Sequence, residues 1–360
     1  MSIANLKRVA LAILIGSIGG WVFYSLNMPL PWMMGSMIFV AAATIAGAPV
    51  ALSLPLRTSM VAALGALLGS AFTPDIVDQL VHWASGVGLM AVFVTVMTAA
   101  SIAMLVRFGH FDRVTAYFSG TPGGLGVMTV LGEQAGGDPR VIPLVHATRV
   151  FVVVLAIPLY LLLVEGLDVP RGARAVVEGP TAGPDELLIL GACAVVGYFA
   201  ARTLRLPGAM IIGPMLVSAA AYLSGIVVSP PPSVLISVAQ VVMGAGIGVR
   251  FAGLEVRRMA WPLLFGVLSA ALMLAGAMLM AGLAAPWLGL SRTALLLALA
   301  PGGLAEMSMI ALALDVDTAF IATMHVIRIM MIVALAPAAF RLIGWNAASP
   351  TVSNGSDAAD

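Results

Sequence analysis

The chain contains little charge and almost no cysteine. Only 9% of its 360 residues are charged, whereas a soluble domain carries about a quarter. Because 61% of the residues are hydrophobic, too few polar side chains remain to cover a water-facing surface, and we expect lipid to be the solvent. The formal net charge of +1 excludes the basic footprint of a nucleic-acid-binding protein.

The scarcity of metal ligands excludes several kinds of site. Cys193 is the single cysteine, which excludes a disulfide framework and a thiolate metal cluster. None of the four histidines forms a metal-ligand pair with another histidine or with cysteine at helical spacing. No serine nucleophile motif or phosphate-binding loop stands out. The sequence therefore predicts no metal, no cofactor and no enzyme.

Apolar segments, in contrast, are abundant. Most are near the 20 residues that a helix needs to cross a bilayer. Lys7 and Arg8 precede the first segment, but no small-residue cleavage site follows it, so we expect a retained helix rather than a signal peptide. The twelve segments lie near 9–26, 30–48, 57–72, 82–106, 114–136, 139–164, 185–201, 207–228, 233–250, 260–288, 293–314 and 318–343.

A polar stretch rich in glycine and proline, 165–184, divides these segments into two sets of six. We therefore predict an all-α integral membrane protein with membrane repeats at 1–164 and 185–345. Residues 346–360 have the composition of a disordered tail.

The two halves are copies of one unit. Residues 122–158 align with 301–337 at a constant offset of 179, with eleven identities in 37 positions. Residues 64–72 match 243–251 at the same offset. Internal repeats are typical of secondary transporters. The identical residues in the first half are Pro122, Gly123, Gly124, Leu125, Met128, Asp138, Ile142, His146, Arg149, Val154 and Pro158.

The fifth segment of each half carries a central PGGL, at 122–125 and 301–304. Proline and paired glycine break a helix, and broken backbone at membrane depth is tolerated only where it lines a cavity or is buried in protein. Each segment is therefore either a kinked spanning helix, which gives parallel repeats with six crossings, or a re-entrant hairpin, which gives inverted repeats with five crossings.

The distribution of lysine and arginine favours the hairpins. With five crossings per half, twelve basic residues lie inside and three outside, whereas six crossings divide them nine to six. We therefore expect inverted repeats in the cell (inner) membrane, with the N-terminus cytoplasmic and the linker 165–184 extracytoplasmic. The parallel arrangement with kinked helices stays open.

Arg149 and Arg328 lie inside apolar helices, where an arginine is costly and usually faces a partner or a water-filled cavity. His146 and His325 precede them by three residues and share their helix faces. We interpret the arginines as substrate-binding residues for an anion, and the histidines as candidates for ion coupling. The alternative is structural: each arginine holds hairpin carbonyls, or each pair joins helices.

Gly123, Gly124, Gly302 and Gly303 form the tips of the two predicted hairpins. A tip exposes free N–H groups at the start of a half-helix, where a membrane-embedded carboxylate can bind. We therefore assign these glycines to the substrate site. The alternative is close packing of glycine against a neighbouring helix.

Glu306 and Glu133 have no counterpart in the other half, because Val127 and Leu312 occupy the matching positions. Unpaired acids in a duplicated frame are what a diverged coupling-ion or substrate site would contain, so we expect ion coupling at both, foremost at Glu306 near its tip. Asp138, followed by Pro139 at a first helical position, and Asp317 have the pattern of helix N-caps instead. Two GxxxG pairs, Gly65/Gly69 and Gly244/Gly248, indicate close helix packing.

With PGGL and H-x-x-R both duplicated, the chain resembles the membrane AbrB-type family, whose hallmark is a duplicated membrane domain. The resemblance covers about 7–345 and depends on TPGGLGVMTVLGEQAGGD…VHATRV and APGGLAEMSMIALALDVD…MHVIRI. Members are often labelled regulators of gene expression or ammonia monooxygenases. Neither label fits these residues, because the sequence has no DNA-binding module and no copper or iron site.

The family is similar to cation–proton antiporters and anion transporters with inverted five-helix repeats. The 2-hydroxycarboxylate and glutamate–sodium symporters of that group carry glycine pairs at hairpin tips, which Gly123, Gly124, Gly302 and Gly303 would match. Those symporters carry a further glycine two residues after the pair. In this chain the position is occupied by Gly126 in the first half and by Ala305 in the second. The resemblance implies a rigid scaffold and a moving core that carries the site across the membrane.

We therefore expect a secondary transporter of a small anionic metabolite, a carboxylate or amino acid, coupled to H⁺ or Na⁺ by alternating access. The alternative is a membrane sensor or regulator of gene expression that does not transport and acts through a partner. The expected partners are a small-molecule substrate, a coupling ion and the lipid bilayer, with no nucleic acid, and a homodimer is left open.

Overall fold

The computed structural model describes residues 3–72, 76–166, 181–314 and 316–344. These ranges contain helices and loops and no strand, which confirms the predicted all-α fold. Most of the predicted linker, 167–180, and the predicted tail, 346–360, lie outside the described residues.

The two halves have the same order of elements. The first half consists of α1 (Ile3–Ser25), α2 (Pro31–Ile45), α3 (Leu54–Leu68), η1 (Gly69–Ala71), α4 (Ile76–Arg107), α5 (Arg113–Gly120), α6 (Leu125–Gln134) and α7 (Val141–Leu163). The second consists of α8 (Pro184–Thr203), α9 (Ala209–Leu223), α10 (Ser233–Gly248), η3 (Val249–Phe251), α11 (Val256–Leu288), α12 (Arg292–Leu299), α13 (Leu304–Ala313) and α14 (Thr318–Ile343).

Eight helices of the described chain are long and apolar enough to cross a membrane, namely α1, α3, α4, α7, α8, α10, α11 and α14. The apolar helices α2 and α9 are shorter, with 15 residues each, or about 22 Å at 1.5 Å per residue. Each half thus supplies four spanning helices and one short apolar helix, in addition to its broken fifth element. The chain is a multi-pass membrane protein.

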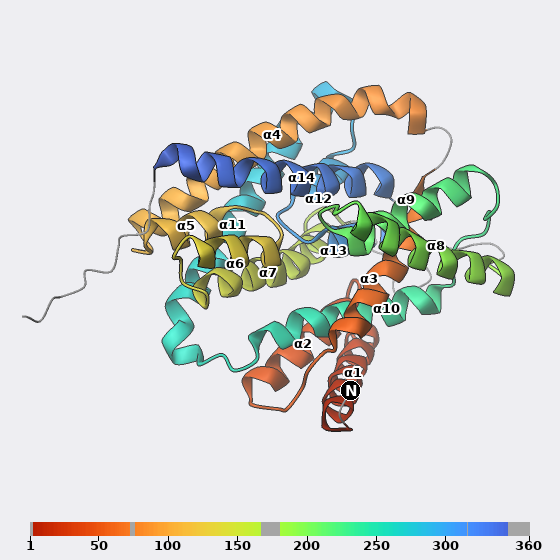
Figure 1. Ribbon diagram of the computed structural model, residues 1–360, viewed down its shortest axis with the longest axis horizontal. Helices are drawn as coiled ribbons and strands as arrows, with labels where there is room; N and C mark the ends of the chain where they lie inside the picture. Colours follow the sequence, from red (N-terminus) through yellow and green to blue (C-terminus); the bar gives the residue numbers. More distant parts are fainter. Residues whose placement is uncertain (1–2, 73–75, 167–180, 315, 345–360) are drawn as a thin grey trace, which may run out of the picture.

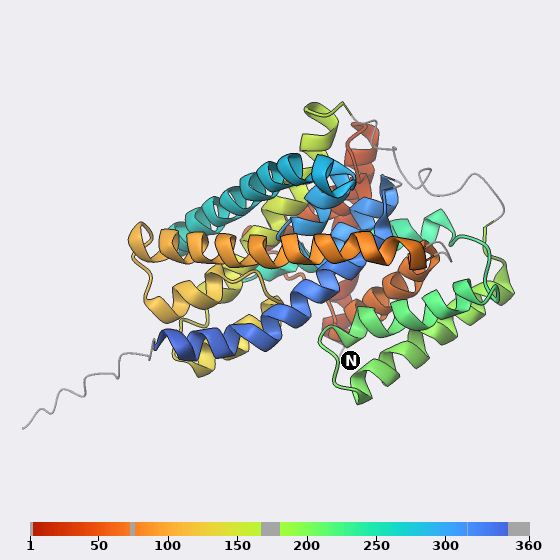
Figure 2. The ribbon, with the colours of Figure 1, turned by 90° about the horizontal axis from the view of Figure 1, so that it is seen from above.

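The helices form two bundles (Figures 1 and 2). One bundle, here called the GxxxG bundle, combines the first three helices of each half: α1, α2, α3, α8, α9 and α10. The other, here called the hairpin bundle, combines α4 to α7 with α11 to α14. Both bundles therefore draw equally on the two halves.

The GxxxG pairs bring helix backbones of different halves into contact. Gly65 of α3 lies against the carbonyl of Ile211 in α9, and Gly69 lies against Ser218, so that a Cβ atom at either glycine would collide with α9. Because both partners advance together along the chain, α3 and α9 run in the same direction. The pair in α10 lies against α2 in the same way. These contacts agree with the packing interpretation.

The fifth segments fold back on themselves. In the second half, the carbonyls of Leu297 in α12 and of Ala300, its C-cap residue, accept hydrogen bonds from His325 and Arg328 in α14. The two contacts advance together, so α12 and α14 are parallel, and α13 between them must run the opposite way. In the first half, the backbone N–H of Asp138, beyond the end of α6, donates to the Thr115 hydroxyl in the first turn of α5 (2.8 Å). Each PGGL is thus the tip of a helical hairpin.

The aspartates beyond the hairpins accept hydrogen bonds from the first backbone N–H groups of the next helices, and Asp317, but not Asp138, occupies the N-cap position. The Asp317 carboxylate accepts from the backbone N–H of Phe320 (2.9 Å) at the start of α14. Asp138 accepts from the N–H of Val141 (3.2 Å). Pro139 is not the first helical residue, because α7 begins at Val141 with Arg140 as its N-cap.

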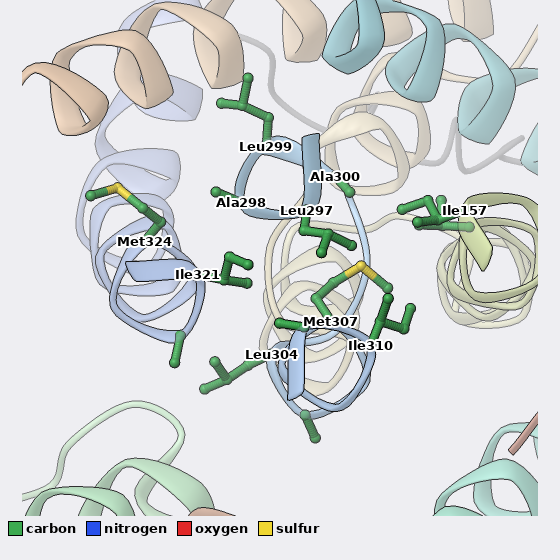
Figure 3. Packing of buried hydrophobic residues seen from close by; sticks show 14 of the residues in the cluster. Ile157, Leu297, Ala298, Leu299, Ala300, Leu304, Met307, Ile310, Ile321 and Met324 are labelled. Carbon is green, nitrogen blue, oxygen red and sulfur yellow. The ribbon is translucent and has the colours of Figure 1, made fainter. Parts of the chain in front are cut away.

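The second hairpin lies in the core of the hairpin bundle. Leu304, Met307 and Ile310 of α13 pack with Ile157 of α7 and Ile321 of α14 (Figure 3). The first hairpin is less enclosed, since the residues of α6 that are buried are Met128 and Gly132. The repeated segments therefore occupy unequal environments.

Candidate functional site

A cavity of about 1070 Å³ lies between the two bundles, slightly larger than typical small-molecule sites. The GxxxG bundle lines it with residues of α3, α9, α10 and η3, and the hairpin bundle with both hairpin tips, α7 and α14. Of the residues assigned to the site from sequence, eight line this cavity: Gly123, Gly124, His146, Arg149, Gly302, Gly303, Glu306 and Arg328.

The two tips use their glycines in different ways. A Cβ atom at Gly123 would lie 2.8 Å from Met128 and 3.0 Å from Ile332 of α14, and one at Gly302 would meet Met307. A Cβ atom at Gly124 would meet nothing closer than 4.0 Å. Gly124 therefore borders open cavity, whereas Gly123 and Gly302 permit close packing.

The half-helices that start at the tips have no side-chain cap. Gly124 and Gly303 are the N-caps of α6 and α13, and neither helix start receives a side-chain hydrogen bond. The first N–H groups of a helix have no partner within the helix. The first tip thus offers free donors and the positive end of a helix dipole to the cavity, whereas the carboxylate of Glu306 lies against the second tip at Gly303.

Arg328 holds the broken end of α12. Its Nη1 donates to the carbonyl of Ala300 (2.6 Å) and its Nη2 to the carbonyl of Gly302 (2.7 Å), with the side chain 3% exposed. These are carbonyls that the helix break leaves without a partner. His325 bonds through Nε2 to the carbonyl of Leu297 (2.9 Å) and does not line the cavity.

Arg149 is bound less tightly than Arg328. Its Nη1 donates to the carbonyl of Ser119 at 3.3 Å, and its Nη2 lies 2.8 Å from His146 Nδ1. His146 Nε2 lies 2.8 Å from the carbonyl of Phe118. A carbonyl can only accept, so Nε2 carries the proton and Nδ1 accepts from Arg149. His146 is therefore a neutral link between Arg149 and the first hairpin.

Glu306 lies at the start of α13, 5% exposed, with its carboxylate folded back against Gly303. This is a favourable place for negative charge. The guanidinium of Arg328 is directed at the tip carbonyls rather than at this carboxylate, and the described ion pairs are Arg258–Glu255 and Arg292–Glu165. Glu306 borders the same cavity as Arg250.

Glu133 and His325 lie away from the cavity. Glu133 is exposed on α6, near the end of the first hairpin that is remote from its tip. His325 is fully buried between α14 and α12. Of the four side chains proposed for ion coupling, Glu306 and His146 therefore border the cavity and these two do not.

The cavity contains more arginine than sequence analysis predicted. Six arginines line it, against two glutamates, Glu255 and Glu306. With neutral histidines, this is an excess of four positive charges. Four of these arginines were not assigned to a site, because they lie at the ends of apolar segments, where basic residues usually mark a membrane surface. They are Arg57, Arg140, Arg250 and Arg258.

The chain is similar over its length to proteins of known sequence. The family model described as "Transition state regulatory protein AbrB" matches residues 32–344. "Uncharacterized protein YhjN" of Bacillus subtilis (strain 168) is 28% identical over 367 residues, covering 94% of each chain. "Putative regulator AbrB" of Escherichia coli (strain K12) is 28% identical over 332 residues, covering 89% of this chain and 92% of that protein.

Proposed function

The chain belongs to the AbrB family, and on that premise we propose that it is a secondary transporter of a small anionic metabolite. The substrate is a carboxylate or an amino acid, carried across the cell membrane by alternating access and coupled to H⁺ or Na⁺. The observation that carries this proposal is the excess of positive charge in a cavity that lies between two bundles. Unpaired charge inside a membrane is costly and marks substrate or ion pathways.

The direction of the helices supports inverted repeats. The equivalent helices α4 and α11 cross with Met97 near Gly276 and with the hydroxyls of Ser101 and Ser269 2.8 Å apart. One partner number rises as the other falls, so these helices run in opposite directions. Equivalent helices of parallel repeats would run the same way. With the excess of basic residues on one side, this supports a cytoplasmic N-terminus and an extracytoplasmic linker.

The cavity walls suggest which part moves. In the GxxxG bundle, glycines hold helix backbones in direct contact, which favours a rigid scaffold. The hairpin bundle carries both tips and meets the scaffold across the cavity. Movement of the hairpin bundle past the GxxxG bundle would expose the tips to each side of the membrane in turn.

The residues assigned to the site have different roles in this proposal. The free N–H groups beyond Gly124 bind the substrate anion. Arg149 lines the same cavity, and its buried Nε has no hydrogen-bond partner among the described residues. Arg328 holds the second tip in the shape that binding requires. Glu306, buried at the cavity wall, exchanges the coupling cation.

A sensor that binds but does not transport is the second candidate, because one relative is named a regulator. Uptake separates the two functions. Purified protein in liposomes should accumulate labelled carboxylates or amino acids above equilibrium when a Na⁺ or H⁺ gradient is imposed, and an ionophore should abolish the accumulation. Saturable binding without any accumulation would contradict transport and favour the sensor.

A further inference from the structure

Two arginines on the scaffold side of the cavity have no hydrogen-bonded partner in the part of the chain that the structure describes. Arg57 lies in the first turn of α3 and Arg250 in η3, so both belong to the GxxxG bundle. Within the described residues, neither guanidinium takes part in a hydrogen bond or an ion pair, and both line the same cavity, where like charges repel each other. In contrast, Arg258 pairs with Glu255 at 3.0 Å, and Arg328 bonds to two carbonyls.

Glu306 neutralises this pair only in part. Its carboxylate borders the same cavity as Arg250, but it is held at the start of α13, against Gly303. One negative charge therefore faces two positive charges. Two guanidiniums that share a cavity wall without partners would be stabilised by a further anionic group, and their planar forks match a carboxylate.

The hairpin bundle provides a separate group of donors. The start of α6 opens to the cavity at Gly124, with Arg149 on the neighbouring α7. η3, which carries Arg250, packs against α7 through Phe251 and Phe151, whose ring centroids lie 5.5 Å apart. The two donor groups thus belong to different bundles and border one cavity, whose volume of about 1070 Å³ leaves room for a ligand that contacts both.

We infer that the substrate carries two carboxylates, one bound at the first hairpin tip and the other by Arg57 and Arg250. The inference rests on the proposed function and narrows the substrate from a small anion to a dicarboxylate. Arg57 and Arg250 are the specificity-determining residues, since they distinguish a second carboxylate from a methyl group at the same place.

Binding to the purified, detergent-solubilised protein tests this independently of transport. Succinate, glutarate and adipate are compared by calorimetry with butyrate, valerate and hexanoate, which have the same carbon numbers and one carboxylate. We expect a dicarboxylate to bind about 10–100-fold more tightly than its match, the value of one or two hydrogen bonds between charged groups. Equal affinities, or no binding of any dicarboxylate, would overturn the inference.

The variants Arg57→Gln and Arg250→Gln should each reduce the ratio of dicarboxylate affinity to monocarboxylate affinity about tenfold, chiefly by weakening the binding of the dicarboxylate. Arg258→Gln is the matched control, because it removes the same charge from the cavity lining but its guanidinium is paired with Glu255. Thermal unfolding checks that each variant is folded. If the affinity ratio falls as far in Arg258→Gln as in Arg250→Gln, the loss of net charge alone explains the effect, and the inference is overturned.

The binding of propyl phosphate, which carries two negative charges on a single group, is measured in the same way. Tighter binding of propyl phosphate than of every dicarboxylate, lost in Arg250→Gln, would assign the arginines to a phosphate and overturn the two-carboxylate assignment. Dicarboxylate binding that depends on both arginines, without accumulation in liposomes, would support this inference while contradicting the proposed transport. Equal transport of succinate and butyrate would contradict this inference while supporting the proposed transport.

Discussion

Replacement of Arg328 by lysine tests how the second hairpin keeps its shape. The arginine fork donates to the carbonyls of Ala300 and Gly302 at once. Lysine keeps the positive charge but donates from a single nitrogen on a shorter stem, so it can satisfy one of these carbonyls. The other carbonyl remains buried without a partner, at a cost of about 1–3 kcal/mol. We expect Arg328→Lys to lower the Tm of the purified protein by several degrees.

Arg149→Lys should be milder, because Arg149 donates to a single carbonyl, at 3.3 Å, and otherwise contacts His146. The loss in substrate affinity should follow the same order, about tenfold or more for Arg328→Lys and less for Arg149→Lys, since a displaced tip no longer aligns its donors. Thermal unfolding in detergent and calorimetric binding of the same two variants measure both effects.

The comparison has a clear refutation. If Arg149→Lys lowers Tm as much as Arg328→Lys, the number of carbonyls bound does not explain the inequality of the two halves. If Arg328→Lys leaves both Tm and affinity unchanged, the guanidinium does not hold the tip, and the placement of this hairpin depends on apolar packing alone.

Three further predictions concern the tip, the topology and the coupling ion. Gly123→Val should abolish transport in an inserted, folded protein, because its side chain would meet Met128 and α14, whereas Gly191→Val on α8, outside the cavity lining and with nothing within 4 Å, should be tolerated. In a cysteine-free background, Thr181→Cys should react with an impermeant thiol reagent in intact cells and Ser2→Cys should not, since the linker is proposed to lie outside. Glu306→Gln should change the pH or sodium dependence of transport more than its substrate preference.

Each of these predictions has a contradicting result and a control. Normal transport by Gly123→Val would show that transport does not depend on close packing of this tip. Labelling at position 2 but not at position 181 would contradict the proposed topology. Position 181 is exposed and suits this assay, whereas Ala182 is 5% exposed. Glu133→Gln is the control for Glu306→Gln, because Glu133 is exposed outside the cavity, and equal effects of the two variants would remove Glu306 from coupling.

The helical hairpins could be predicted from sequence because their signal is local. Proline followed by two glycines stops a helix wherever it occurs. Because the motif recurs at 122–125 and 301–304, it belongs to the repeated unit and is not a coincidence of composition. The GxxxG contacts were predictable for a similar reason, since a face without side chains is useful only for close approach. The partner helices were not, because they belong to the other half of the chain.

The cavity could be predicted only in part. Arg149 and Arg328 are conspicuous because they interrupt apolar helices, yet nothing in the sequence shows that Arg328 is directed at backbone carbonyls. Arg57 and Arg250 lie at segment ends, and hydropathy cannot distinguish a membrane surface from a cavity that reaches it. Only the packing of α3 and α10 between the other helices places these two side chains beside the tips.

The contact between the first hairpin and α14 has a consequence for synthesis of the protein. The Tyr117 hydroxyl donates to the carbonyl of Ala336, 219 residues later in the chain (2.7 Å), and Gly123 lies against Ile332. At about 5–20 residues per second, the ribosome needs roughly 10–45 s to make that stretch. Throughout this time the broken backbone of the first hairpin is inserted without its final neighbour. Assembly of the hairpin bundle must therefore wait for the last helix, and a nascent chain that stalls in the second half leaves the first tip without its cover.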